Sequence, residues 1–171
     1  MNQPNAIAAF SMVLLTCQRR YLLLERAASK RFAPGKWTGL GGRIEPGELD
    51  DVRAAALREL AEEAGLRPDE IARFTLRRTL LHARPGAPLT LLLHFTGELA
   101  ESILPPCPEG TLHWVAPEEL NSLDLIDNAA LVIPALIADL TRDPEGIEPV
   151  VVGAARYAPD GSLAAEAIVW A

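Results

Sequence analysis

Runs of apolar residues separated by turn-forming residues predict strands in both halves of the chain. Residues 6–17 are almost entirely apolar, and residues 21–26 follow a short polar turn, so these two segments are expected to form a hairpin. Two further apolar segments, 74–83 and 89–99, are separated by a turn that contains Pro and Gly. Shorter strands are expected at 37–40 and 111–115, and a terminal hairpin is expected from 148–157 and 162–170.

Residues 50–65 have the composition of a helix, because Ala, Leu, Arg and Glu dominate the segment. Asp50 or Asp51 can cap its start, and Gly65 can end it in a left-handed conformation. A helix with one apolar arc packs that arc against a core. The arc expected to do so contains Leu57, Leu60, Ala61 and Ala64.

Three carboxylates, those of Glu59, Glu62 and Glu63, share another arc of about 100° on the same helix. Like charges at this spacing repel one another, and Arg58 can offset only part of that repulsion. A divalent cation would offset it better, and clustered carboxylate oxygens suit a hard ion such as Mg²⁺ or Mn²⁺. The loop before the helix contains residues that constrain the backbone and let it approach a phosphate closely: Gly41, Gly42, Pro46 and Gly47.

A second helix is expected to start at Asp127 or Asn128, either of which can cap it, and to end near residue 140. Pro134 lies inside this segment and is expected to kink or divide the helix. Two helices placed among hairpin-connected strands are typical of a mixed sheet packed between helices. The pattern therefore predicts the α/β class.

Length and composition narrow the possibilities further. A chain of 171 residues with 49% apolar residues fits one domain, residues 1–171, with a full core. Its net charge of −7 argues against a partner of duplex nucleic acid, although a nucleotide can bind if Mg²⁺ bridges the two. With no charged-then-apolar leader and no apolar run near 18 residues, the protein is expected to be cytoplasmic and not membrane-bound. Cys17 and Cys107 are isolated and are expected to be buried free thiols, and the oligomeric state is left open.

The segment 41–66 resembles a Nudix box, whose pattern is G-x5-E-x7-R-E-U-x-E-E-x-G-U with U aliphatic. Nine residues separate Glu48 from Arg58, where the pattern has seven. Either the loop carries two extra residues, which we favour, or Asp50 takes the first acidic position. The residues that match are Gly42, Glu48, Arg58, Glu59, Leu60, Glu62, Glu63, Gly65 and Leu66.

This resemblance implies a Nudix α/β/α sandwich with a mixed sheet and a hydrolase that cleaves a diphosphate linkage with Mg²⁺, or with Mn²⁺. It implies metal ligation by Gly42, Glu48, Glu59, Glu62 and Glu63. One of the helix glutamates, or Glu109, would take the proton from the attacking water. The implied catalytic residues are Arg58, Glu59, Glu62, Glu63 and Glu109.

The segment 31–48 is also similar to the Nudix branch that hydrolyses oxidised purine nucleoside triphosphates such as 8-oxo-dGTP. That similarity implies a nucleotide substrate that leaves as monophosphate and pyrophosphate. Thr38 stands where an Asn that reads the purine is common, and Asp127 with Asn128 replaces an acidic pair. Alternatives are another diphosphate-linked substrate such as ADP-ribose, or a nucleotide-sensing module without catalysis. The implied substrate-binding residues are Phe32, Lys36, Trp37, Thr38, Gly41, Gly42, Asp127 and Asn128.

Several of these candidates have a plainer interpretation. Phe32 and Trp37 are as readily explained by core packing as by a base pocket, and Lys36 by a solvated loop charge. The three histidines share no ligand spacing and are expected to be packed or surface residues.

Overall fold

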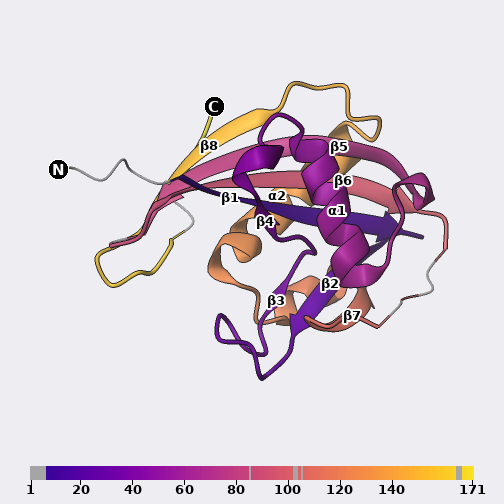
Figure 1. Cartoon of the computed structure of the whole chain (residues 1–171), viewed down its shortest axis with the longest axis horizontal. Coiled ribbons are helices and arrows are strands. Elements are labelled where there is room, and N and C mark those ends of the chain that lie inside the picture. The colour runs from indigo at the N-terminus through magenta and orange to yellow at the C-terminus, as the bar shows by residue number, and fades with distance from the viewer. Residues whose placement is uncertain (1–6, 85, 102–103, 105, 165–166) are drawn as a thin grey trace.

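In the described part of the chain, nine strands form one mixed sheet (Figure 1). A computed structural model describes residues 7–84, 86–101, 104, 106–164 and 167–171. The helices are α1 (Val52–Ala64) and α2 (Asp127–Arg142), with 3-10 turns η1 (Pro46–Glu48), η2 (Pro68–Glu70) and η3 (Pro117–Ser122). The strands are β1 (Ile7–Cys17), β2 (Arg20–Arg26), β3 (Trp37–Thr38), β4 (Arg43–Ile44), β5 (Ile71–Ala83), β6 (Leu89–Leu99), β7 (Gly110–Val115), β8 (Val151–Arg156) and β9 (Ile168–Trp170).

The sheet combines parallel and antiparallel pairs. Its spatial order is β3-β2-β1-β6-β5-β8-β9, with β4 added beside β1 and β7 beside β2. β1 with β6 and β5 with β8 are parallel, whereas the other strand pairs are antiparallel. The prediction of a mixed sheet is therefore confirmed.

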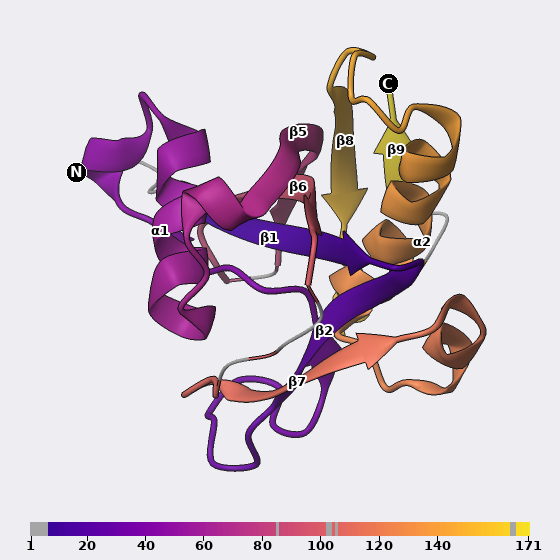
Figure 2. The ribbon, with the colours of Figure 1, turned by 90° about the vertical axis from the view of Figure 1, so that its right-hand side faces the viewer.

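Each face of the sheet has its own apolar core. Val13 and Phe95 belong to the cluster that includes the buried residues of α1, and Leu14 belongs to the cluster that includes those of α2. Because successive strand side chains point to opposite faces, neighbours such as Val13 and Leu14 enter different cores. Figures 1 and 2 show α1 and α2 on opposite sides of the sheet. The predicted α/β/α sandwich is confirmed.

The start of α1 is capped by Asp51 rather than Asp50, because the Asp51 carboxylate accepts a 2.9 Å hydrogen bond from the Ala54 N–H. Gly65 ends the helix with a φ of 61°, the left-handed conformation expected for it. The prediction that Ala61 faces the core is wrong, because Ala61 is exposed. Ala55 and Ala56 are buried instead, and their small side chains let the helix lie close to the sheet.

The N-cap position of α2 is Ile126, which offers no side-chain acceptor, so the predicted cap by Asp127 or Asn128 is wrong. The predicted division at Pro134 is also wrong, since α2 runs through that residue to Arg142. Pro134 lies on the exposed side of the helix, where water can bond the carbonyl that proline leaves without an N–H partner.

Short elements account for the other differences. β3 ends at Thr38 rather than at residue 40, and β4 was not predicted, because two residues carry no periodic signal. β8 and β9 pair in antiparallel fashion, which confirms the terminal hairpin, but both strands are shorter than predicted. Both cysteines are free, and Cys17 is buried, whereas Cys107 is only half-buried. Among the described residues, neither helix is long and apolar enough to cross a bilayer.

Buried ion pairs attach the C-terminal end of α2 to β5. Arg78 donates to both oxygens of Asp139 at 2.6 and 2.7 Å, and Arg77 donates to Asp143 at 2.7 Å. Asp143 also accepts the backbone N–H groups of residues 146–148. Removing Asp139 would leave the buried Arg78 charge uncompensated, at a cost of about 3–5 kcal/mol. These pairs therefore fix where α2 ends.

His94, in the middle of β6, is enclosed on all sides, with 1% of its surface exposed. Its Nδ1 has no hydrogen-bond partner among the described residues. Burial, opposed by a backbone hydrogen bond to Arg78, lowers the pKa of His94 to about 4. The imidazole therefore stays neutral in the folded protein where an exposed histidine would take up a proton.

We expect this burial to make folding pH-dependent. Below about pH 6.5 the unfolded chain protonates His94, but the folded chain does so only near pH 4. Stability from the neutral imidazole is thus present above pH 6.5 and is lost as pH falls toward 4. Urea unfolding at pH 7.5 and 5.5 should show a loss of free energy of unfolding about 1 kcal/mol larger in the native protein than in His94→Gln. Equal losses would contradict this prediction, and other titrating groups cancel in the comparison.

Candidate active site

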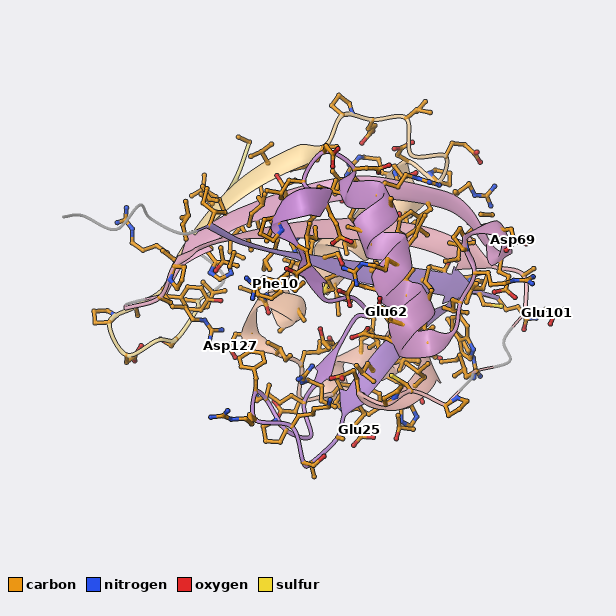
Figure 3. All side chains as sticks on the ribbon, viewed as in Figure 1. Phe10, Glu25, Glu62, Asp69, Glu101 and Asp127 are labelled. Carbon is orange, nitrogen blue, oxygen red and sulfur yellow. The ribbon has the colours of Figure 1, made fainter. Side chains whose placement is uncertain are left out.

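The glutamates of α1 point toward the loop that precedes the helix. The Glu59 side chain is 14% exposed and the Glu62 side chain is 60% exposed, so the face runs from a sheltered interior to open solvent. Figure 3 shows Glu62 on α1 and Asp127 on the separate segment where α2 begins. The carboxylates of the helix are therefore buried to different extents.

Arg58 is the centre of this carboxylate cluster. Its Nε and Nη2 donate to the two oxygens of Glu48 at 2.6 and 2.9 Å. Nη2 also lies 3.0 Å from Glu59 Oε1, and Nη1 donates to Glu62 Oε2 at 2.9 Å. The Arg43 carbonyl accepts a further bond of 3.1 Å from Nη2. One guanidinium thus links η1, β4 and two helical turns of α1.

The structure places Glu48, and not Asp50, against Arg58. Glu48 belongs to η1, and its Oε2 also accepts the Glu45 N–H at 2.9 Å. The residues between η1 and α1, including Leu49 and the cap Asp51, form a turn that absorbs the longer spacing. The contact matches the interpretation in which two extra residues precede the helix.

The two glycines before β4 shape the backbone around the carboxylates. The Gly41 N–H donates to Glu63 Oε2 at 2.9 Å, and Gly41 has a φ of 124°, which favours glycine. A Cβ added at Gly42 would lie 2.3 Å from Glu59 Oε2, so a larger residue would force that carboxylate to move. The Gly42 carbonyl accepts the Ser11 N–H at 2.8 Å, which leaves one lone pair available to another ligand.

Burial and charge act differently on each carboxyl group. Burial raises the pKa of Glu63 to about 7, although the Gly41 hydrogen bond opposes the shift. Burial also raises the pKa of Glu59, against the pull of Arg58. The bond to Arg58 lowers the pKa of Glu48. The sheltered carboxyl groups are therefore the ones that most need a neighbouring positive charge.

Glu109 joins the cluster from the loop before β7. Its carboxylate forms an ion pair of 2.5 Å with Lys30, and its charge contributes to the raised pKa of Glu63. Arg26, at the end of β2, acts on Glu63 in the opposite direction. Sequence reasoning missed Arg26 and Ser11, since only the paired strands bring them to the helix. A polar residue inside the apolar run 6–17 was the one available signal for Ser11.

The residues fit a hard divalent cation by their chemistry, because carboxylate oxygens of Glu59 and Glu63 lie against the same glycine loop. They do not form a finished cage. In the part of the chain that the structure describes, no three acidic, histidine or cysteine side chains are arranged so that they could hold a metal ion together. Arg58 engages oxygens of Glu48, Glu59 and Glu62, so a bound ion would have to share them with it.

The predicted base-binding residues are divided between two places. Trp37 contacts His113 in a tilted arrangement, with ring centroids 4.8 Å apart, and packs with the α2-side core, across the sheet from α1. Lys36 pairs with Asp124 at 2.8 Å, and the charge of Asp127 also acts on Lys36. Trp37 bonds through its backbone to Asp124 and Ile126. Lys36, Trp37 and Asp127 therefore form one group beside the start of α2, and Thr38 and Asn128 adjoin it in sequence.

Phe32 lies apart from Trp37, in the loop between β2 and β3, and 54% of its surface is exposed. Arg26 and Arg84 each approach its ring, at 5.8 and 5.9 Å from the centroid. A shallow cavity of about 360 Å³ lies nearby, lined by residues that include Arg26, Cys107 and Thr111. Among the described residues, the lining of this cavity includes Arg26 but neither Phe32 nor a glutamate of α1.

The chain belongs to the NUDIX domain family, whose sequence profile matches residues 6–136. An NAD-capped RNA hydrolase NudC from Stutzerimonas stutzeri (strain A1501) is 36% identical over 101 residues, which are 58% of this chain and 32% of that protein. An oxidized purine nucleoside triphosphate hydrolase from Danio rerio is 42% identical over 62 residues, 36% of each chain. This chain thus spans about a third of the length of the named relatives it matches.

Solved structures with low identity share the fold. A MutT protein from Bacillus halodurans has a TM-score of 0.67 at 20% identity, covering 95% of this chain and 97% of its own. The NUDIX domain of Shewanella oneidensis NrtR, complexed with ADP ribose, has a TM-score of 0.62 at 16% identity, covering 81% and 90%. These likenesses support the sandwich architecture and carry no information on substrate.

The network around Arg58 predicts that its geometry matters beyond its charge. Arg58→Lys keeps the charge but loses the fork that binds Glu48 at two points and reaches Glu59. We expect turnover of a nucleotide substrate to fall about 10–100-fold, with the fold retained. Arg67→Lys, on the exposed η2 turn, is the matched control. A fully active Arg58→Lys would mean that Arg58 only neutralises the helix face.

Proposed function

We propose that the protein hydrolyses a phosphoanhydride bond of a nucleotide, with a divalent cation bound among the carboxylates of α1. The observation that carries this proposal is the convergence of Glu48, Glu59 and Glu62 on Arg58, beside the Gly41 contact to Glu63. A network that gathers like charges in this way favours the binding of a cation, and a bound cation would in turn attract a phosphate chain. Membership of the NUDIX family and two named relatives that are hydrolases support the enzyme class.

Each residue would have a distinct task. Glu59, Glu62 and Glu63, with the Gly42 carbonyl, would hold Mg²⁺ or Mn²⁺, which supplies positive charge to offset charge on the phosphate oxygens. Both oxygens of Glu48 are held by Arg58, so Glu48 is better suited to fixing Arg58 than to direct ligation. Arg58 keeps the remaining carboxylates in place through charge-assisted bonds. A carboxylate of Glu63, Glu59, Glu62 or Glu109 would accept the proton of the attacking water.

For the substrate we propose a purine nucleoside triphosphate, including its 8-oxo form, cleaved to monophosphate and pyrophosphate. The name of the Danio rerio relative supports this choice. Asp127 and Asn128, at the start of α2, offer polar groups that could read a base edge. A second candidate is a diphosphate-linked nucleotide such as ADP-ribose or a capped RNA end, and the name of the Stutzerimonas stutzeri relative favours the capped RNA end. A binding module without catalysis is the third, and the intact set of carboxylates disfavours it.

Glu63 is the sharpest test of the cation site. Glu63→Gln removes a charge but preserves size, and we expect at least about a 10²-fold loss of turnover at limiting Mg²⁺, because weaker perturbations of metal sites already cost 10–100-fold. Release of pyrophosphate or phosphate measures the rate, and circular dichroism confirms the fold. Glu118→Gln, on the exposed η3 turn, is the control. Near-normal turnover in folded Glu63→Gln would rule out its role in binding the cation.

Substrate choice is tested by comparing kcat/KM for 8-oxo-dGTP, dGTP, dCTP and ADP-ribose, with Mg²⁺ and with Mn²⁺. We expect a purine triphosphate to be preferred, because an unpaired buried acceptor costs about 1–3 kcal/mol and discriminates about 5- to 150-fold. Asp127→Ala should reduce that preference, whereas Asp69→Ala, far from the start of α2 in Figure 3, should not. Equal values for purine and pyrimidine triphosphates, or ADP-ribose as the best substrate, would exclude the purine triphosphate.

A further inference from the structure

Arg84, at the end of β5, is held between two aromatic rings that come from distant parts of the chain. Its guanidinium carbon lies 4.6 Å from the ring centroid of Tyr157, after β8, and 5.9 Å from that of Phe32. One Nη2 bond to the Tyr157 hydroxyl, at 3.4 Å, is long. Three separate segments thus position this one cation, although none of them needs it to complete a core.

Among the described residues, the charge of Arg84 has no carboxylate partner. Most other arginines of this acidic chain, such as Arg58, Arg78 and Arg142, lie within 4.0 Å of a carboxylate. In the described residues no carboxylate lies that close to Arg84, and the bond to Tyr157 is the one acceptor for its side-chain donors. A half-buried guanidinium with unused N–H donors is well suited to an anion, and its planar fork matches a phosphate.

The position of Arg84 relative to the carboxylates follows from Phe32. The Phe32 ring also lies under Arg26, whose Nε donates to the Phe32 carbonyl at 3.0 Å. The charge of Arg26 reaches Glu63. Arg84 and Arg26 therefore both lie near the Phe32 ring, and Arg26 acts on the carboxylate cluster, which Arg84 does not contact in the described part of the chain.

We propose that Arg84, with Phe32 and Tyr157, forms an anion subsite that binds a phosphate group of the ligand remote from the scissile anhydride. The group would be attached to the far side of the nucleoside, as a 3′-phosphate is. It can come from a free nucleotide bisphosphate or from the next phosphodiester of an RNA 5′ end. The inference rests on the proposed function in taking the ligand to be a nucleotide.

Binding without a metal tests the subsite independently of hydrolysis. In EDTA, calorimetry compares adenosine 5′-monophosphate with adenosine 3′,5′-bisphosphate and with the 5′-phosphorylated dinucleotide pApA. We expect the added phosphate to tighten binding about tenfold or more in the native protein, as charge-assisted hydrogen bonds do. A gain for the bisphosphate alone identifies a free nucleotide as the source, and a gain for pApA identifies an RNA end. If neither gains, or neither binds measurably, the proposal is wrong.

Variants show whether the gain depends on Arg84. Arg84→Gln should abolish it, and Arg84→Lys should retain only a small part, because lysine lacks the planar fork. Phe32→Leu keeps the charge but removes one ring, so an intermediate loss is expected. Arg156→Gln removes an exposed charge from the neighbouring β8 and should have no effect. An equal loss in Arg156→Gln would mean that net charge, not a built subsite, binds the phosphate. If the native protein shows the binding gain but hydrolyses no nucleotide, the proposed function is contradicted and the anion subsite is not.

Discussion

The repulsion among carboxylates on one helical face is the constraint around which this molecule is arranged. Glu59, Glu62 and Glu63 are within reach of one another on α1, and Glu48 approaches from η1. Arg58 offsets part of this repulsion with its positive charge. It reaches Glu48 because the chain before the helix folds back over Arg58. The conformation of the loop and the charge balance of the helix therefore depend on each other through Arg58.

This arrangement depends on small residues. Gly42 leaves the space that Glu59 occupies, and Gly41 adopts a backbone conformation that lets its N–H meet Glu63. Ala55 and Ala56 keep α1 close to the sheet, so the loop and helix remain within contact distance. The sandwich contributes rigidity, since β1 carries residues of both cores and supports the loop through Ser11.

Elements with long periodic patterns were predictable from the sequence. β6 and α1 extend over enough residues for composition and spacing to indicate them, and the box glutamates follow from their place on one helix. β4 and the 3-10 turns η1 and η2 are too short to carry such a pattern. The choice of Glu48 over Asp50 at Arg58 needed the folded loop, because both lie at plausible spacing.

Contacts between distant segments also could not be predicted from the sequence. Arg26 reaches the carboxylate cluster because β2 is paired with both β3 and β7. Trp37 turned out to pack with His113 and the α2-side core, which local sequence cannot reveal because it does not specify the face of a two-residue strand. Side-chain contacts that depend on strand pairing can be assigned only once the order of the strands is known.

The two ends of α2 are held very differently, and this has a bearing on how such a protein can change over time. Its last turns are tied to β5 by buried ion pairs, whereas its first turn has no side-chain cap and carries Asp127 toward solvent. Asp127 is exposed, so substitutions of this residue disturb few contacts and stability places little constraint on them. If that position reads the base as proposed, mutation can explore new base preferences there while the anchored end keeps the sandwich folded.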